Sequence, residues 1–528
     1  MISVIANEAD WPVVREFFEL FKTPWRFYTP ESNPVVLLCA GNVVPPADAA
    51  LVIIYGSDLL EVDKLEGAGC ESRTGPATFQ HGDIEFPVYV RLLADAVSQK
   101  IVYRRGELNG RPYVRIGFDL FAEIRNLLAN GQPANNAVVA ALEQHIAVLR
   151  NVILNQGLPL VEIPPRPAGF DFIACLTHDV DHVGIRNHKF DHTMFGFLYR
   201  ATAGSLLDVC VGKRNVGHLG RNIFAALRLP FVHLGLARDF WYQFDEYTAL
   251  EEGRPSTFYV IPKKGEAGLD ARGRRMPRRA ASYDAAELKD FLRRLESAGK
   301  EVTVHGLDAW RDTTAGQEER GLISGLVNNE AAGIRMHWLY FDAEAPGKLE
   351  AAGYDYDSTM GYNETIGYRA GTVQVFKPLT TQQLLELTMH IMDTALFYPS
   401  YLNLSDKQAE SAIEPLLDNA VRFGGVLTVN WHDRSLAPER LWGEFYQKLI
   451  RQMQKRNAWF ATAAQAVAWF RKRRAAQFEM TPAGTVKVTL PADSDEKLPA
   501  LRITSQRSKN STPVEETAYN GWEASLAA

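Results

Sequence analysis

The sequence predicts an α/β protein with a mainly parallel sheet or barrel, preceded by a separate α/β domain. From residue 170 to about residue 475, apolar strand-like runs alternate with amphipathic helical segments, the order that gives parallel sheets. The proline-rich stretch EIPPRPAG at residues 162–169 divides this region from residues 1–160, and we place a domain boundary there. The composition, 46% hydrophobic and 23% charged, is typical of a globular chain that buries large cores.

The N-terminal α/β domain is predicted to span residues 1–160. Its β-branched runs at residues 35–39 and 50–56 are typical of buried strands. Residues 136–157 predict a helix that ends at Gly157. The apolar positions that share one face of this helix are Leu142, Ile146, Leu149 and Ile153. No motif in this domain indicates its role.

The predicted barrel domain covers residues 170–476. Residues 282–299 predict an amphipathic helix with Asp284 as its N-cap and Gly299 at its end. A mostly helical insertion at residues 184–250 is expected to cover part of one face. Residues 477–528 are predicted to be a small C-terminal extension, partly β, with a mobile end. The expected strands of the barrel lie at residues 171–179, 256–262, 301–306, 333–341, 353–359 and 424–433.

Nearly every one of these strands ends in polar residues. In a parallel barrel the carboxyl ends of all strands lie at one face, so side chains far apart in the sequence meet there. We therefore expect one polar pocket built from residues spread over most of the barrel domain. The strand-end groups are His178, Asp179, Asp181, His305, Arg335, His337, Asp355, Asp357, His432 and Asp433.

Charge and cysteine usage restrict the function classes. The net charge of −6 gives no support for a nucleic-acid partner, whose phosphates attract a basic face. The four cysteines are scattered without a CxxC pair, which fits a reducing compartment. No run of 18 apolar residues predicts a transmembrane segment, and the start MISVIANEADWPVV lacks the features of a signal peptide, so we expect a cytoplasmic protein.

Asp179 and Asp181 are the first candidate site residues. Alternation at a strand end puts both carboxylates on one side, where one can bind a metal and the other can act as a general base. The alternative interpretation, a surface turn, is the commoner one for an isolated Asp-x-Asp. For the neighbouring His178 and His182, a supporting or surface role is expected.

The later strand ends supply imidazoles and a guanidinium. His305 follows the run EVTV and is a candidate metal ligand, although a histidine there is more often structural. Arg335 and His337 alternate along GIRMHW; Arg335 can fix an anionic group or make a salt bridge. His432, in VNWHDRS, is a candidate general acid, and Asp433 is expected to be a turn residue.

These groups occur in an order that resembles the polysaccharide deacetylase superfamily, carbohydrate esterase family four, with its NodB-homology domain. The five family motifs are matched by THDVD at residues 177–181, VTVHGLDAW at 302–310, GIRMHW at 333–338, YDYDST at 354–359 and LTVNWH at 427–432. The resemblance covers roughly residues 170–475. It implies a distorted (β/α) barrel of about seven strands.

The resemblance also implies a role for each site residue. Asp179 would be the general base, Asp181 a metal ligand and His432 the general acid. Arg335 would orient the base, Asp357 would support the site, and His305 would be the second metal ligand. The cofactor implied is a divalent metal ion, with zinc expected.

Two positions depart from the family pattern. The second motif usually has another histidine four residues after the first, where this chain has Ala309. The third motif usually has a proline where this chain has His337. We expect His337 to supply the third ligand, because zinc sites with three protein ligands keep an open position for water. Asp308 and His182 are rival ligands.

The sequence thus predicts a metal-dependent hydrolase that removes an acetyl group from an N-acetylated sugar or glycan precursor, acting on a carbon–nitrogen bond other than a peptide bond. Asp179 would accept a proton from the attacking water, and His432 would protonate the leaving amine. One alternative is a catalytically inactive glycan-binding relative, which the loss of histidine at position 309 favours. Another is a hydrolase of small non-peptide amides on the same barrel.

Overall fold

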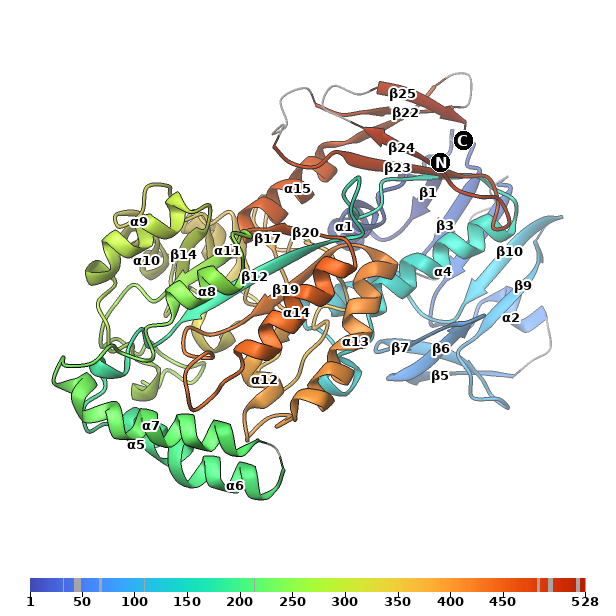
Figure 1. Ribbon diagram of the computed structural model, residues 1–528. Helices are drawn as coiled ribbons and strands as arrows, with labels where there is room; N and C mark the ends of the chain where they lie inside the picture. The colour runs from blue at the N-terminus through green and yellow to red at the C-terminus, as the bar shows by residue number, and fades with distance from the viewer. Residues whose placement is uncertain are drawn as a thin grey trace.

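The structure is a computed structural model of the chain. It describes residues 1–31, 33–41, 49–65, 69–108, 110–212, 214–481, 485–491, 497–518 and 523–527. Figure 1 shows the N-terminal part beside the central curved sheet, with a group of helices projecting on one side and the C-terminal strands on another.

The N-terminal part is built on a six-stranded sheet in the order β2-β1-β3-β4-β10-β9, parallel except for the antiparallel pair β9 and β10. Two antiparallel pairs, β5 with β8 and β6 with β7, lie beside it. The strands are β1 (Ile2–Ile5), β2 (Trp25–Phe27), β3 (Val36–Cys39), β4 (Leu51–Tyr55), β5 (Cys70–Thr74), β6 (Ala77–His81), β7 (Ile84–Val88), β8 (Arg91–Asp95), β9 (Tyr103–Leu108) and β10 (Arg111–Ile116). The helices are α1 (Trp11–Phe21), α2 (Glu61–Leu65), α3 (Leu120–Ala129) and α4 (Ala141–Asn155).

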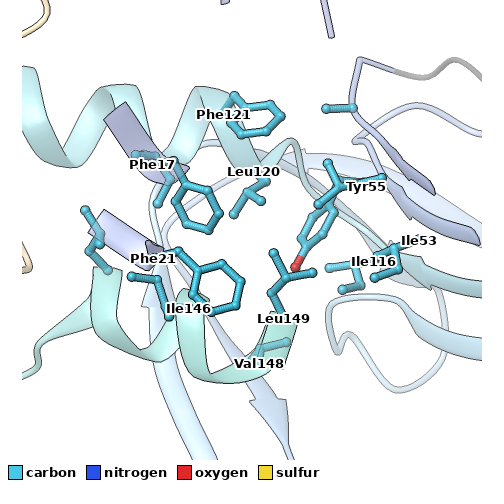
Figure 2. Packing of buried hydrophobic residues seen from close by; sticks show 14 of the residues in the cluster. Phe17, Phe21, Ile53, Tyr55, Ile116, Leu120, Phe121, Ile146, Val148 and Leu149 are labelled. Carbon is cyan, nitrogen blue, oxygen red and sulfur yellow. The ribbon is translucent and has the colours of Figure 1, made fainter. Parts of the chain in front are cut away.

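Aromatic and aliphatic side chains from three of these helices form the core over the sheet. Figure 2 shows Phe17 of α1, Phe121 of α3 and Leu149 of α4 gathered in one cluster with Tyr55 of β4. The helix predicted at residues 136–157 begins at Ala141, and Gly157 follows its end with a φ of 69°. Glycine has no Cβ and so adopts this left-handed conformation at little cost.

The central sheet has nine strands among the described residues, in the order β17-β16-β15-β14-β13-β12-β19-β18, with β20 pairing the first half of β12. All of its pairings are parallel. No described pairing joins β17 to β18, so the curled sheet is open at that seam. The strands are β12 (Phe172–Val180), β13 (Thr257–Val260), β14 (Glu301–Gly306), β15 (Gly333–Met336), β16 (Tyr356–Asp357), β17 (Leu385–Glu386), β18 (Ile391–Met392), β19 (Val426–Asn430) and β20 (Ala458–Ala461).

Helices follow most of these strands and bury their apolar faces against the sheet. The helix predicted at residues 282–299 is present as a 3-10 turn followed by α9, and the Asp284 side chain accepts a hydrogen bond from the Ala286 N–H. The helices around the sheet are α9 (Lys289–Ser297), α10 (Thr313–Ser324), α11 (Ala345–Ala351), α12 (Asp393–Phe397), α13 (Asp406–Phe423), α14 (Gly443–Lys455) and α15 (Ala463–Ala475).

The segment between β12 and β13 is helical, and its first helices project from the sheet (Figure 1). Its elements are α5 (His192–Tyr199), the π-helical turn η4 (Arg200–Gly204), α6 (Ser205–Cys210), α7 (Val216–His233) and α8 (Phe244–Leu250). These helices place His192, Thr193 and Arg200 beside the carboxyl ends of the strands, in the wall of a cavity described below.

The C-terminal strands join the rest of the chain by hydrogen bonds. β11 (Leu160–Glu162) pairs with β23 (Leu501–Gln506), which pairs with β24 (Val514–Ala518). A second small sheet contains β21 (Gln477–Met480), β22 (Thr485–Thr489) and β25 (Glu523–Ala527). Of the end predicted to be mobile, residues 519–522 and 528 lie outside the described residues.

The N-terminal part shares a core with the region around the central sheet. Met360, Ala370 and Phe376 belong to the same buried cluster as the N-terminal helices. Arg473 of α15 donates hydrogen bonds to the carbonyls of Glu19 and Leu20 at 3.0 and 2.9 Å. The two parts therefore stabilise one another instead of folding around unconnected cores.

Candidate metal centre

The polar side chains at the end of β12 point to opposite sides of the sheet. Thr177 and Asp179 face Arg335, which donates to the Thr177 hydroxyl at 2.8 Å and to Asp179 Oδ1 at 2.9 Å. His178 points the other way, where Nδ1 lies 2.8 Å from the Trp431 carbonyl and Nε2 lies 2.7 Å from Glu251 Oε1. The period-2 alternation of a strand therefore separates His178 from the site.

Neighbouring strand ends bring a carboxylate and two imidazoles together. Asp181 follows the last residue of β12, His305 lies in β14, and His337 follows β15. Asp181 Oδ1 lies 3.4 Å from His305 Nε2 and 3.6 Å from His337 Nε2. One potential ligand atom from each of the three residues lies within 4.8 Å of the others, close enough to bind one ion.

The donor atoms of this group suit a divalent cation. Asp181 Oδ1 is buried and accepts no hydrogen bond. The His305 Nδ1 lies 2.9 Å from the Arg335 carbonyl, which fixes the proton on Nδ1 and leaves the Nε2 lone pair directed toward Asp181. Burial lowers the pKa of His337 to about 3, so its imidazole stays neutral, the form that binds metals. The residues present therefore fit the implied ion.

The carboxylate of Asp179 is held by two donors beside this group. In addition to Arg335, the Asn430 Nδ2 donates to Asp179 Oδ2 at 2.8 Å. Burial opposes ionisation of Asp179, but the Arg335 guanidinium and the nearby imidazoles outweigh it and hold the pKa of Asp179 below its ordinary value. His305 Nε2 lies 3.8 Å from Oδ2, which places this ionised carboxylate next to the candidate metal ligands.

His432 is held by a buried aspartate. The Nδ1 of His432 lies 2.6 Å from Asp393 Oδ1, and the His432 backbone N–H donates to Asp393 Oδ2 at 2.7 Å. Burial disfavours the charged imidazole, but Asp393 raises the pKa of His432 to about 9. The ring therefore carries a proton at neutral pH. Its Nε2 lies 3.9 Å from Asp181 Oδ2 and faces the same cavity.

A cavity of about 530 Å³ opens over these groups. Asp179, Asp181, His305, His337 and His432 all contribute to its wall. Aromatic and basic side chains line much of the remainder: Arg200, Arg278, Arg279, Trp338, Tyr340, Tyr398, Tyr401, Arg434 and Arg440. The cavity has a size typical of a small-molecule site, and charged side chains make up much of its wall.

His337 reaches the cavity by a different route from the one predicted. The pattern at residues 333–341 predicts a continuing strand, whereas β15 ends at Met336 and His337 begins a 3-10 turn. Trp338 and Leu339 then take positive φ values of 66° and 54°. Such values are uncommon for residues other than glycine and cost free energy. The turn, and not strand alternation, directs the His337 ring toward Asp181.

Of the two rival ligands and Asp357, only His182 lines the cavity. Asp308 accepts a hydrogen bond from the Leu269 N–H at 2.8 Å and is not part of the cavity wall. His182 lines the cavity, but its Nδ1 lies 3.1 Å from His188 Nε2. Asp357 does not line the cavity. The next residue, Ser358, contacts Arg335 instead, through its carbonyl at 3.1 Å and its hydroxyl at 3.0 Å.

Two residues of this arrangement were missed from the sequence. Asp393 directly follows the short strand β18, and the apolar run before it in LTMHIMD was a usable signal of another strand end. Asn430 lies two residues before His432, but its contact with Asp179 depends on the pairing of β12 with β19. Both residues hold a predicted catalytic group in place.

No family model and no curated protein matches the sequence. Solved structures do match. A Mycobacterium smegmatis protein provisionally assigned as a polysaccharide deacetylase has 16% identity and a TM-score of 0.33, over 59% of this chain and 95% of that chain. PuuE allantoinase has 13% identity and a TM-score of 0.36, over 58% and 92%. A CE4 family pseudoenzyme from Bacillus anthracis has 10% identity and a TM-score of 0.26, over 56% and 65%. The chain is thus similar, over little more than half of its length, to solved structures described as polysaccharide deacetylases and CE4 family members.

Proposed function

We propose that the chain belongs to the polysaccharide deacetylase superfamily and is a metal-dependent hydrolase that removes the acetyl group of an N-acetylated sugar or glycan precursor. The observation that carries this proposal is that three candidate metal ligands lie next to an ionised carboxylate and a protonated imidazole. In the group Asp181, His305 and His337, His305 Nε2 lies 3.8 Å from Asp179 Oδ2 and Asp181 Oδ2 lies 3.9 Å from His432 Nε2. A general base and a general acid beside a Lewis acid are what amide hydrolysis requires.

Asp179 would accept one proton during the reaction, and His432 would donate another. When bound, a divalent cation, for which we propose zinc, would act as a Lewis acid toward the acyl group and the attacking water. Asp179 accepts a proton from that water, and Arg335 and Asn430 keep its carboxylate in one orientation. His432 donates its Nε2 proton to the leaving amine nitrogen, while Asp393 stabilises the imidazolium before the transfer.

The cavity wall supports a sugar as the substrate. Trp338 is 38% exposed and lies at the cavity with Tyr340, and Tyr398 and Tyr401 line the same space. Aromatic faces pack against the apolar C–H face of a pyranose ring, while the surrounding polar groups bind its hydroxyls. This combination favours a carbohydrate over a small, fully polar amide.

The experiment measures acetate release from a panel of N-acetylated sugars, and ring opening of small cyclic amides, by the zinc-loaded full chain. Asp179→Asn should retain the metal but slow acetate release by roughly 10²–10⁴-fold, because an amide cannot accept the proton. Asp181→Ala should lose metal and activity together. Asp308→Asn, outside the cavity, is the matched control and should behave as the unmodified chain. A near-normal rate for Asp179→Asn would remove Asp179 as the base.

A further inference from the structure

Three arginines converge on the wall of the cavity beside the candidate metal ligands. Arg200 comes from the π-helical turn after α5, and Arg434 and Arg440 come from the loop between β19 and α14. Arg440 is only 3% exposed. Three cations from two distant segments therefore share one water-facing space with Asp181 and His432.

These guanidinium groups lack the anionic partners that buried cations ordinarily have. Among the described residues, none of the three forms an ion pair with a carboxylate. The Nε and Nη1 of Arg440 and the Nε of Arg200 are buried without a hydrogen-bond partner. The nearby Glu439 instead accepts from the Trp241 Nε1 at 3.3 Å through Oε2. A buried, unpaired charge is costly, so the arrangement is better satisfied with an anion present.

Contacts with aromatic rings position the cations without neutralising them. The Arg434 guanidinium carbon lies 5.1 Å from the Trp241 ring centre, and that of Arg440 lies 4.7 Å from the Trp442 ring centre. Burial, together with the charges of Arg440 and Arg200, lowers the pKa of Arg434 to about 9. Although burial acts in the opposite direction, the three arginines lower the pKa of the Tyr398 phenol. The positive potential is therefore concentrated at this wall.

We propose that Arg200, Arg434 and Arg440 bind a phosphate or diphosphate group of the substrate. The planar guanidinium fork matches phosphate oxygens, and three forks from different directions exceed what one carboxylate can accept. The acetylated sugar would then be joined to a phosphate ester or diphosphate. Only the identity of the sugar rests on the proposed function, because the anion site is argued from the contacts of the three arginines alone.

The first test measures the binding of inorganic pyrophosphate to the zinc-loaded full chain by calorimetry. Arg434→Gln and Arg200→Gln should each weaken binding by at least about tenfold, the effect of losing a charge-assisted contact. Arg451→Gln, on the exposed face of α14, is the matched control and should bind normally. Unchanged affinity in both cavity variants would overturn the proposal. So would binding that is lost in Asp181→Asn but survives in Arg434→Gln, because the anion would then be on the metal.

The second test compares acetate release from three substrates that carry the same N-acetylated sugar. One is linked to a nucleoside diphosphate, one to a polyprenyl phosphate in detergent, and one is neutral. The kcat/KM for a phosphate-linked substrate should exceed that for the neutral one by at least about tenfold, and Arg434→Gln should abolish the difference. Preference for the neutral sugar contradicts the proposal. If no substrate is hydrolysed, the proposed function fails while pyrophosphate binding still decides the anion site.

A second, independent observation concerns the surface of the projecting helices. Of the 24 large apolar side chains that are exposed among the described residues, 13 lie between residues 190 and 236. On α7, Phe224, Leu227 and Phe231 follow helical spacing and are 60%, 67% and 54% exposed. A concentration of exposed apolar side chains of this kind marks an interaction site.

The charge of the same segment is opposite to that of the chain. Residues 184–238 contain eight lysines and arginines but only two aspartates and no glutamate, whereas the whole chain has a net charge of −6. Basic residues interleaved with exposed apolar ones are typical of helices that lie in a membrane interface and bind anionic headgroups. A second copy of the chain would bring the same positive charge against itself, so this composition disfavours self-association.

We infer that residues 190–236 bind the surface of a bilayer that contains anionic lipids. The helices would lie along the interface: among the described residues, no helix is long and apolar enough to span a bilayer. Figure 1 shows α5, α6 and α7 projecting away from the sheet, where a flat surface can reach them. Because Arg200 of the same segment lines the cavity, the bound membrane would lie close to the arginine site.

The test is sedimentation of the full chain with vesicles of phosphatidylcholine alone and with about 30% phosphatidylglycerol. Binding to the anionic vesicles should exceed binding to the neutral ones and fall with added salt. The double variant Phe224→Asp with Leu227→Asp should lose binding, whereas Val97→Asp, at a residue 92% exposed on the N-terminal part, should not. If the double variant binds the anionic vesicles as well as Val97→Asp does, the inference is wrong. The inference is also wrong if the double substitution converts a dimer to a monomer and leaves vesicle binding unchanged.

Discussion

The two imidazoles of the candidate metal centre are fixed to different degrees. His305 is oriented by the Arg335 carbonyl, whereas the Nδ1 of His337 is buried without a hydrogen-bond partner. A ligand whose second nitrogen is hydrogen-bonded is oriented before the metal arrives, and an unanchored ring is not. The contribution of His337 to metal affinity is therefore the one that most needs a direct measurement.

Replacing His337 by alanine should lower zinc affinity by more than about 100-fold, the upper end of what loss of an outer partner costs. His337→Gln should be nearly as damaging, because an amide is a poorer zinc ligand than imidazole. Metal content after dialysis and competition with a chelator measure both effects. Asp308→Ala and His182→Ala are the comparisons. A larger loss in either would assign the third ligand to that residue instead.

Asp357 and Glu386 form a buried pair of carboxyl groups away from the cavity. Burial raises the pKa of Asp357, and burial together with Asp357 raises that of Glu386. Raised pKa values mean that the folded state keeps protons that the unfolded state releases. The contribution of the pair to stability is therefore complete below about pH 4 and is lost as the pH rises through the raised values.

The free energy of unfolding of the unmodified chain should consequently decline between about pH 5 and 8 by more than that of Glu386→Gln. The glutamine carbonyl still accepts from the Met360 N–H, which Glu386 Oε1 now accepts at 2.8 Å. Urea denaturation across this pH range measures the difference. The exposed Glu330→Gln is the control and should follow the unmodified chain. Parallel curves for Glu386→Gln and the unmodified chain would contradict this account.

At the scale of the element, the close packing of β15 on β16 depends on one glycine. A Cβ built at Gly333 would lie 1.9 Å from the Tyr356 ring, and both residues sit in the first register position of the pair. Arg335 is two residues further along the same strand. Displacement of the strand at Gly333 would therefore move the guanidinium that holds Asp179.

Gly333→Ala should destabilise the protein by about 3 kcal/mol or more, at the upper end of overpacking effects, and should reduce acetate release in the folded fraction. Gly347→Ala, inside α11 with no atom within 4 Å of the added Cβ, should instead stabilise by roughly 0.5–1 kcal/mol. Chemical denaturation of the two variants checks the opposite signs. Equal denaturation midpoints for the two variants would show that β16 moves to accept the added methyl group without loss of stability.

At the scale of the whole molecule, a buried arginine connects the N-terminal part to the central sheet. Arg473 of α15 is 1% exposed and donates to the carbonyls of Glu19, Leu20 and Ile163, and to Gln374 Oε1. Two of its partners, Glu19 and Leu20, lie more than 400 residues before it in the chain. One side chain therefore satisfies several backbone acceptors at the junction.

Arg473→Met should lower the free energy of unfolding by at least about 3 kcal/mol, because several buried acceptors lose their donor at once. Hydrogen exchange at the Ile163 amide, which donates to the Lys22 carbonyl at 3.0 Å, should become faster as the junction opens. Arg471→Met, which removes a single bond to the Asp355 carbonyl near the surface, is the control and should have a small effect. Unaltered stability of Arg473→Met would mean that the shared core alone holds the two parts together.

The sequence by itself determined the features that depend on local pattern. Strand alternation set Asp179 apart from His178, and capping chemistry at Asp284 and Gly157 marked helix ends. The order of polar strand ends predicted that Asp181, His305 and His432 would meet, because parallel strands place their carboxyl ends at one edge. These properties follow from periods of two and 3.6 residues, which a sequence displays directly.

Only the tertiary structure decided which side chains complete the site. Asp393 and Asn430 contact His432 and Asp179 through strand neighbours, and Ser358, not Asp357, contacts Arg335. The three cavity arginines meet because an insertion folds back over a loop that follows it by more than 200 residues in the chain. Such contacts arise from the register and curvature of the sheet, which the packing of the whole chain sets and no short segment encodes.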